Sequence, residues 1–240
     1  MSTPSDFSDK VIIVTGPGGN LGSAVIKRFK PENPSFVLLD RHSERLNQRF
    51  PELAKTTGHL LIPDIDLVNQ ESVHAAIQKA INTFGHIDCV IHTAGGFQMG
   101  EQVHEITAES WNHMMDLNVK TLLNISRSVI PQMIHQQSGK IITIGARPSF
   151  SGKARMGAYS AAKTAVLRLT ESMSAELKSK GINVNCVIPG TIDTPDNRQA
   201  MPDADTSRWV SPESLADVIY FLCSRAANDI HGSAIPVYGK

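Results

Sequence analysis

Short, almost entirely apolar runs recur along this chain and alternate with segments that have a helical rhythm. Such runs are typical of strands that are covered on both faces, as in a parallel sheet. The clearest helical segment places Val73, Ile77, Ala80 and Phe84 on one face, at three- and four-residue steps that a strand cannot use. Seven strands are predicted, at residues 11–14, 36–39, 59–62, 87–91, 140–144, 183–188 and 234–238.

This alternation continues to the end of the chain and implies right-handed crossover connections between parallel strands. We therefore predict an α/β fold with a doubly wound parallel sheet, in three layers with helices on both faces. The sequence contains no internal repeat, low-complexity tract or linker, so residues 1–240 are expected to form a single domain. A chain of this length buries roughly 70% or more of its unfolded surface and needs no covalent cross-links to fold.

The charge balance disfavours two classes of partner. Lysine and arginine total 23, aspartate and glutamate also total 23, and the formal net charge is zero. No broad field therefore attracts a nucleic acid or an anionic membrane. A small-molecule substrate, or contacts with other proteins, is favoured instead.

The three cysteines indicate a reducing compartment. Cys89, Cys186 and Cys223 are far apart, lie in apolar runs and form no CxxC pair, so we expect buried free thiols and neither a disulfide framework nor a metal site. Residues 1–9 are short and polar, and no run approaches the roughly 18 apolar residues of a membrane span. We expect a soluble cytoplasmic protein.

The first predicted strand leads into a glycine-rich turn and then into a helical stretch. Glycines at such a turn let backbone N–H groups approach a pyrophosphate at the helix N-terminus, where the helix dipole favours negative charge. A glycine cluster alone is a weak signal, and it gains weight here from its position after a strand. The candidate cofactor-binding residues of this turn are Gly16, Gly18, Gly19, Asn20, Leu21 and Gly22.

A carboxylate ends the second predicted strand. Asp40 follows Gly22 by 18 residues, close to the spacing at which a carboxylate accepts hydrogen bonds from an adenine ribose. A carboxylate there repels a 2′-phosphate, so NAD(H) is favoured, while the neighbouring Arg41 leaves NADP(H) open. The alternative for Asp40 is a helix N-cap or turn residue, which the preceding glycine-rich turn disfavours.

The third and fourth strands are expected to end at the same edge of the sheet, where open α/β sheets bind ligands. Asp64 is predicted to accept a hydrogen bond from the adenine amino group, with Ile65 beside it in the cofactor site. The small residues Ala94, Gly95 and Gly96 would let the backbone approach the cofactor, although glycine pairs also make simple turns.

A polar residue interrupts the apolar stripe of a later segment. Trp111, Leu122 and Ile125 share one predicted helix face, and Asn118 fills the gap between them. A buried amide costs free energy unless it is paired, so Asn118 is expected to bond a partner or an ordered water. From this segment alone, a structural network with backbone carbonyls is as well supported as a functional role. Pro131 is predicted to stop the helix near its end.

Tyr159 and Lys163 lie one helical turn apart in the segment that follows, so they share a face. A lysine ammonium beside a phenol favours the phenolate and lowers a pKa that is ordinarily about 10. Such a phenol can act as a general acid near neutral pH. The alternative is a surface tyrosine packed along a lysine side chain, and the pair alone does not decide between the two.

These motifs in this order, with a later strand that ends in Pro189 and Gly190, resemble the short-chain dehydrogenase/reductase family over nearly the whole chain. The resemblance implies a Rossmann fold and a nicotinamide-dependent oxidoreductase. It implies that Tyr159 is the catalytic acid/base, that Lys163 holds the nicotinamide ribose and lowers the tyrosine pKa, and that Asn118 supports a water in the proton relay. The residues implied to contact the nicotinamide end of the cofactor are Pro189, Gly190, Ile192 and Thr194.

Two residues depart from the family's pattern. Asn20 stands where the glycine-rich turn usually has glycine, and asparagine tolerates left-handed backbone geometry better than most residues. Ala146, 13 residues before Tyr159, stands where the family has a serine that polarises the substrate oxygen. The loss of such a donor costs on the order of 100-fold in rate, and Ser149 or Ser151 replaces it only if the loop folds back.

A narrower resemblance, to dihydropteridine reductases, includes Ala146, the AGG turn and a similar tail up to Trp209. Their quinonoid substrate accepts hydride into a conjugated ring, where a tyrosine can protonate it without a neighbouring serine. Asn118, by contrast, follows the wider family. Residues 191–210 are expected to form a substrate loop, in which Trp209 closes over a planar substrate or anchors the loop to the core. The candidate substrate residues are Ala146, Arg147 and Trp209.

Three functions follow from this pattern. The first is an NADH-dependent oxidoreductase that acts on a small ketone, imine or quinonoid substrate. The second is a secondary-alcohol or sugar dehydrogenase with a substitute for the missing serine. The third is a dinucleotide-binding sensor or scaffold that has lost catalysis, but such a protein has no chemical need to retain Tyr159, Lys163 and Asn118.

The helix that carries the tyrosine also suggests self-association. Its small residues Gly157, Ala161 and Ala165 favour a close contact with another helix. Because relatives commonly assemble in this way, a homodimer or homotetramer is expected.

Overall fold

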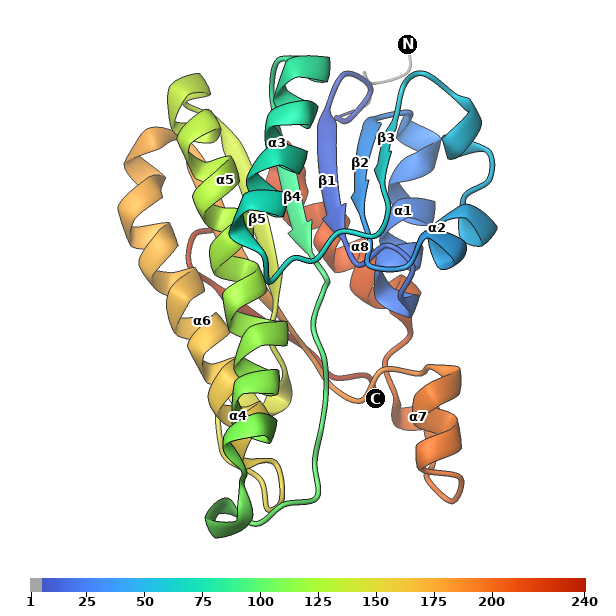
Figure 1. The fold of residues 1–240 in the computed structure, drawn as a ribbon, viewed down its shortest axis with the longest axis vertical. Coiled ribbons are helices and arrows are strands. Elements are labelled where there is room, and N and C mark those ends of the chain that lie inside the picture. Colours follow the sequence, from blue (N-terminus) through green and yellow to red (C-terminus); the bar gives the residue numbers. More distant parts are fainter. Residues whose placement is uncertain (1–5) are drawn as a thin grey trace.

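In the computed structural model, which describes residues 6–240, seven parallel strands form one sheet in the order β3-β2-β1-β4-β5-β6-β7 (Figure 1). Residues 1–5 of the polar amino-terminal segment lie outside the described range. The prediction of a doubly wound parallel sheet is confirmed. The strands are β1 (Val11–Thr15), β2 (Ser35–Leu39), β3 (Leu60–Ile62), β4 (Cys89–His92), β5 (Gly139–Ile144), β6 (Ile182–Pro189) and β7 (Ala234–Val237).

Helices cover both faces of the sheet and make the fold Rossmann-like (Figure 1). Helices α1 and α8 pack together on one face, and α3, α5 and α6 cover the other. Within residues 6–240, no helix combines the length and apolar character needed to span a bilayer. The helices are α1 (Asn20–Phe29), α2 (Ser43–Arg49), α3 (Gln70–Phe84), α4 (Ala108–Met115), α5 (Thr121–Gln136), α6 (Gly157–Leu177), α7 (Pro195–Ala200) and α8 (Pro212–Cys223).

The central strand β1 shows why the apolar runs are continuous. Ile12 and Val14 lie in the core beneath α1 and α8, whereas Val11 and Ile13 lie in the core beneath α3 and α5. All four side chains are at most 2% exposed. Successive residues of a strand point to opposite faces, so a strand that is buried on both sides needs apolar residues throughout.

The sheet reverses its winding next to β1. Thr15, the last residue of β1, pairs with Leu39 of β2 on one side and with His92 of β4 on the other. The chain runs outward from β1 to β3 and then crosses back to add β4 on the opposite side. Such a switch point opens a crevice beyond the carboxyl ends of the strands.

The helix predicted around Asn118 contains a π-helical turn. Helix α4 ends at Met115, a π-helical turn covers Asp116–Lys120, and α5 begins at Thr121. Leu122 is buried as expected, but Trp111 is 40% exposed. The wider π turn rotates α4 relative to α5, so the stripe does not keep one face across the junction.

Pro131 does not stop the helix near that point, contrary to the prediction, because α5 continues to Gln136. A proline removes one backbone donor and strains the preceding turn. Val129 and Met133, on either side of it, are fully buried in the core that α5 shares with α3. This packing keeps the helix intact through the proline.

Candidate functional site

A cavity of about 300 Å³ lies at the switch point, beyond the carboxyl ends of β1, β2 and β4. It brings together many residues that the sequence assigned to a cofactor, from four separate segments of the chain. The predicted residues in its lining are Gly16, Gly18, Gly19, Asp40, Arg41, Ile65, Ala94 and Gly95.

The glycine-rich turn packs too tightly for larger residues. Gly16 has a φ of +66°, in the left-handed region that favours glycine. A β-carbon on Gly22 would collide with the carbonyl oxygen of Gly16 and would lie 2.9 Å from Thr93 Oγ1. Gly22 is thus required for helix α1 to approach the turn, although it is not part of the cavity lining.

Helix α1 begins at the turn with unpaired backbone donors. Gly19 is its N-cap residue and provides no side-chain cap, and the first turn contains no acidic residue. Asn20 is the first helical residue and is not among the residues with positive φ, so its tolerance of left-handed geometry is not used here. The free N–H groups and the helix dipole fit the pyrophosphate of a dinucleotide.

Asp40 ties the turn to the end of β2. Its Oδ2 accepts a hydrogen bond from the Gly18 N–H at 2.7 Å, and its Oδ1 accepts one from the His42 N–H at 2.9 Å. Helix α2 is capped by His42, so Asp40 is not an N-cap, although its bond to His42 makes it part of a local turn. Each carboxylate oxygen has a second lone pair that remains able to accept from a ribose hydroxyl.

The structure revises the surroundings of Asp40. Arg45, which sequence reasoning missed, lines the cavity together with Arg41. Its signal in the sequence is its spacing, four residues after Arg41. Asp64, by contrast, is exposed and is not among the lining residues, and its Oδ1 accepts a hydrogen bond from the Ser43 N–H at 3.3 Å.

A buried polar network beneath the cavity was also missed. Thr15 Oγ1 lies 3.0 Å from His92 Nδ1, and His92 Nε2 lies 3.3 Å from Thr121 Oγ1. The hydroxyl of Thr121 donates to the Leu117 carbonyl, so it accepts from His92, whose proton is then on Nε2. Burial, with a smaller effect of the Lys163 charge, lowers the pKa of His92 to about 3, so the imidazole is neutral.

This network positions the segment after β4. Thr15 Oγ1 accepts a hydrogen bond from the Ala94 N–H at 3.1 Å, and the Thr93 hydroxyl donates to the Thr15 carbonyl at 2.6 Å. Both contacts hold Thr93 and Ala94 against the end of β1. The network therefore fixes this part of the cavity wall, to which Thr93 and Thr121 also belong.

Asn118 is 1% exposed and lies in the π-helical turn between α4 and α5. Its Nδ2 donates to the carbonyl oxygens of Gly96 (3.1 Å) and Met114 (3.0 Å), and its Oδ1 accepts from the Gly96 N–H at 3.3 Å. The predicted partners of this amide are thus backbone groups. π-helical turns occur frequently at functional sites, so the two interpretations of Asn118 do not exclude each other.

Tyr159 and Lys163 lie in the first two turns of α6. Lys163 Nζ donates to the Ile144 carbonyl at 2.9 Å, and burial lowers the pKa of this amine to about 8. Burial also raises the pKa of Tyr159 to about 12, which corrects the expectation that Lys163 lowers it. The ammonium is directed to Ile144 and lies 6.0 Å from the centroid of the phenol ring, so desolvation of the phenolate dominates.

Gly95 brings these groups to the cavity. A β-carbon built on Gly95 would lie 2.9 Å from Asn118 Oδ1 and 3.3 Å from Lys163 Nζ. Gly95 also lines the cavity. Asn118 and Lys163, which come from different segments of the chain, therefore both lie behind one residue of the cavity wall.

The loop after β5 folds back on itself. A short 3₁₀ turn over Arg147–Ser149 places Ser149 Oγ 3.1 Å from the Ala146 N–H, which donates to it. Ala146 and Ser149 are 6% and 5% exposed. The guanidinium of Arg147 lies 5.0 Å from the centroid of the Tyr238 ring. The loop thus folds back so that the Ser149 hydroxyl lies beside the backbone of position 146.

The predicted substrate loop is more regular than its composition indicates. Helix α7 lies within it, and the Thr194 hydroxyl caps this helix by accepting from the Asn197 N–H at 3.1 Å. Ile192 pairs with Val210, which joins the two ends of the loop. Trp209 is partly buried.

Pro189 is the last residue of β6 and pairs with Val237 of β7, and Gly190 follows it. The Gly190 N–H donates to the Val237 carbonyl at 2.9 Å, and a β-carbon on Gly190 would lie 2.7 Å from the Tyr238 carbonyl oxygen. In the part of the chain that the structure describes, no group of three or more His, Cys, Asp or Glu side chains is arranged to hold a metal ion.

Comparison with known proteins identifies the family. Residues 10–205 match the family model described as short chain dehydrogenase. The chain belongs to the short-chain dehydrogenase family. One relative is an uncharacterised oxidoreductase of Staphylococcus haemolyticus (strain JCSC1435), which is 28% identical over 224 residues, or 93% of this chain and 95% of the relative.

Solved structures share the short-chain dehydrogenase fold. An NAD⁺-bound xylitol dehydrogenase is 24% identical with a TM-score of 0.88, and the match covers 98% of this chain and 99% of that one. ElxO with NADP bound is 23% identical with a TM-score of 0.87, over 96% and 97% of the two chains. Proteins of this fold are thus known with either dinucleotide.

Proposed function

We propose that this chain is a nicotinamide-dependent reductase in which Tyr159 protonates a small ketone, imine or quinonoid substrate. The observation that carries the proposal is the convergence of Asn118 and Lys163 behind Gly95, in the wall of the cavity at the switch point of the sheet. When bound, the nicotinamide cofactor supplies the hydride. Tyr159, on helix α6, supplies the proton to the substrate.

The protonation states favour reduction. The phenol of Tyr159, with a pKa of about 12, is protonated at neutral pH and is able to donate. Lys163, with a pKa of about 8, is largely charged there, and its ammonium has three donors, of which the Ile144 carbonyl takes one. The remaining donors can bind ribose hydroxyls and stabilise the phenolate that forms on proton transfer.

The cofactor proposed is NADH, because Asp40 places a buried carboxylate where a 2′-phosphate would lie. Arg41 and Arg45 line the same part of the cavity and could attract a 2′-phosphate. NADPH is therefore proposed as a second cofactor with slower turnover. The glycine-rich turn and the uncapped N-terminus of α1 would hold the pyrophosphate in either case.

A planar quinonoid substrate, similar to a dihydropteridine, fits the surroundings of Tyr159. Phe97 packs edge-to-face on the Tyr159 ring with centroids 4.8 Å apart and is itself 56% exposed, so it offers an aromatic surface beside the phenol. Ala146 provides no hydroxyl, and a conjugated ring that accepts hydride does not require one. Trp209 is the proposed residue that closes the loop over such a ring.

A second function is favoured by Ser149. Its hydroxyl oxygen lies at the backbone of position 146, so it can replace the serine that is usual there. The protein would then act as a secondary-alcohol or sugar dehydrogenase. The two functions differ in whether turnover depends on the Ser149 hydroxyl.

A substrate screen tests the proposal. The purified chain is mixed with NADH or NADPH and with a simple ketone, a quinone or a quinonoid dihydropterin, and absorbance at the nicotinamide band is followed. We expect NADH oxidation with at least one class. Binding of NADH without turnover in any class would instead indicate a sensor or scaffold.

The proposed assembly is a homodimer or homotetramer. Trp111, on α4, is 40% exposed and Gly157 begins the neighbouring helix α6. A mass of about two or four chains by light scattering supports this assembly, and a mass of one chain of 26.1 kDa contradicts it.

A further inference from the structure

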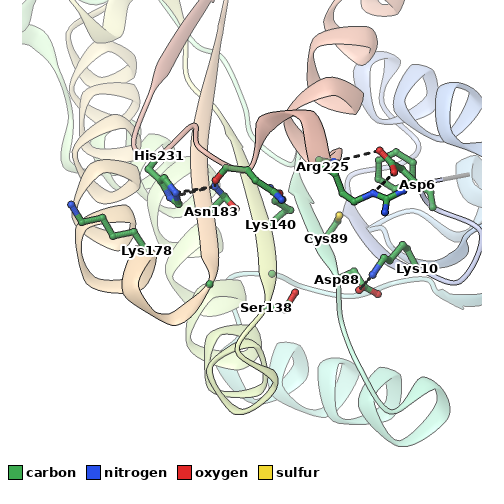
Figure 2. Close-up of a pocket in the computed structure, with 15 residues that line it drawn as sticks. Asp6, Lys10, Asp88, Cys89, Ser138, Lys140, Lys178, Asn183, Arg225 and His231 are labelled. Carbon is green, nitrogen blue, oxygen red and sulfur yellow. Dashed lines mark hydrogen bonds and ion pairs between the residues drawn. The ribbon is translucent and has the colours of Figure 1, made fainter. Parts of the chain in front are cut away.

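A second cavity, of about 420 Å³, lies at the amino ends of β4, β5 and β6, at the opposite edge of the sheet from the dinucleotide cavity (Figure 2). Its walls come from the segment before β1, the starts of three strands, and the chain after α8. The proposed hydride transfer uses no residue of this cavity. The charged groups that line the cavity are therefore not explained by that reaction.

The lining has more positive than negative charges. Four cationic side chains line it, together with the carboxylates of Asp6 and Asp88. Asp6 Oδ1 pairs with Arg225 Nε at 2.6 Å, and Asp88 Oδ1 pairs with Lys10 Nζ at 2.8 Å. Each of the two carboxylates thus neutralises one of the four cations. The cavity keeps an excess of positive charge, although the formal net charge of the whole chain is zero. The cationic side chains are Lys10, Lys140, Lys178 and Arg225.

Lys140 is the central unneutralised group. Its Nζ donates to the amide oxygen of Asn228 at 2.7 Å, and among residues 6–240 it forms no ion pair with a carboxylate. Asp229 acts on it electrostatically without a hydrogen bond. An ammonium has three donors, so two remain for a group in the cavity. Figure 2 shows Lys140 between Asn183 and Arg225.

Two cysteine thiols lie in the wall beside Lys140. Cys89 and Cys223 are 2% and 5% exposed, and their thiols interact with each other. Burial raises the pKa of Cys223, so its thiol stays neutral. Burial is also the main cause that lowers the pKa of Lys140, a cost that an anion in contact with the ammonium would offset.

We propose that this cavity binds a small anion that carries carboxylate or phosphate groups, with Lys140 as its principal contact and the exposed Lys178 at its rim. The volume, the excess of cationic side chains and the unused donors of Lys140 all fit such a ligand. Lys140 lies on β5, whose other end leads to Ala146. A ligand here would be bound at a distance from the reacting groups.

Calorimetry with the full chain tests the site, with inorganic phosphate and succinate as separate probes. We expect at least one probe to bind, and Lys140→Gln to weaken that binding about tenfold or more, because a charged partner of the anion is removed. The control is Lys79→Gln, which removes an exposed lysine of α3 and is expected to change the affinity less than about twofold. Phosphate binding alone assigns a phosphate ligand, and succinate binding alone a carboxylate ligand.

A second measurement uses the parent protein, so its result does not depend on whether the Lys140→Gln variant folds. Lysine acetylation, followed by mass spectrometry, is compared with and without the probe. We expect the bound anion to protect Lys140 about threefold or more, while Lys79 is unchanged. The proposal is wrong if neither probe binds below about 10 mM, a limit for even a weak specific contact. It is equally wrong if Lys140→Gln binds as tightly as the parent or if Lys140 is not protected.

Discussion

Lys163 Nζ donates a hydrogen bond to the carbonyl oxygen of Ile144, 2.9 Å away. This contact joins the buried face of α6 to the carboxyl end of β5, two residues before Ala146. It sets the position of the Tyr159 helix relative to the sheet before any cofactor is present. Lys163 is 7% exposed, so its charge is held in a poorly solvated site where it acts strongly on its neighbours.

The protonation of Lys163 predicts how reduction depends on pH. Below its pKa of about 8 the amine is charged, and Tyr159, with a pKa of about 12, is a neutral donor over the same range. As pH rises through about 8, Lys163 loses its charge first and the phenolate product loses its stabilisation. We expect kcat for reduction to fall above that pH in a profile from about pH 6 to pH 10. A rate that rises through this interval would contradict the assignment.

Gly95→Ala tests whether Asn118 and Lys163 meet behind the cavity wall. The added carbon would lie 2.9 Å from Asn118 Oδ1, so the surrounding groups must shift. We expect a loss of about 1–3 kcal/mol in the free energy of unfolding and at least about a tenfold loss of turnover. Denaturant titration and steady-state kinetics measure the two effects.

Gly58→Ala is the control for that substitution, because an added carbon there meets no atom within 4 Å. It is expected to change the unfolding free energy by less than about 0.5 kcal/mol and to leave turnover intact. Equal behaviour of the two variants would show that Gly95 has no special role.

Asp40→Asn tests the basis of cofactor preference. Removal of the carboxylate charge relieves the repulsion of a 2′-phosphate and leaves Arg41 and Arg45 to attract it. We expect the ratio of kcat/KM for NADPH to that for NADH to rise about tenfold, which corresponds to about 1.4 kcal/mol. Arg45→Gln is expected to move the ratio in the opposite direction. An unchanged ratio in both variants would remove these residues from cofactor selection.

Ser149→Ala separates the two proposed substrate classes. If the Ser149 hydroxyl polarises the substrate oxygen, ketone turnover should fall on the order of 100-fold, and Ala146→Ser in the same chain should restore it. Reduction of a quinonoid ring should change little, because it does not require that donor. Kinetics of the single and double variants with both substrates distinguish the cases. Ketone turnover that Ser149→Ala leaves unchanged would exclude the hydroxyl as the donor.

The sequence predicted the sheet and the edge at which the cavity lies, because these depend on local patterns. Runs such as Val11–Val14 are apolar at every position, and that requires burial on both faces. Gly18 and Asp40 were both assigned to the carboxyl edge of the sheet, and the structure adds the hydrogen bond between them. The residues concerned could be named before their contacts were known.

Other features depend on contacts between distant segments and could not be predicted. The pKa of Tyr159 rises because surrounding elements exclude water, a burial that the spacing to Lys163 does not reveal. The Thr15–His92–Thr121 network depends on the register between β1 and β4. Pro131 lies inside α5 because tertiary packing outweighs the low helix propensity of proline. The local sequence does not reveal that packing.

Tyr159→Phe tests the central claim most directly, because it removes the phenolic hydroxyl and keeps the aromatic ring that packs on Phe97. Tyr220→Phe is the control, since Tyr220 lies on the α8 face of the sheet, where it contacts Phe29 and Glu32. NADH affinity is measured by fluorescence titration and kcat by NADH oxidation. We expect Tyr159→Phe to bind NADH within about twofold of the parent and to lose about 100-fold or more in kcat, while Tyr220→Phe retains both. Undiminished turnover in Tyr159→Phe would contradict the account.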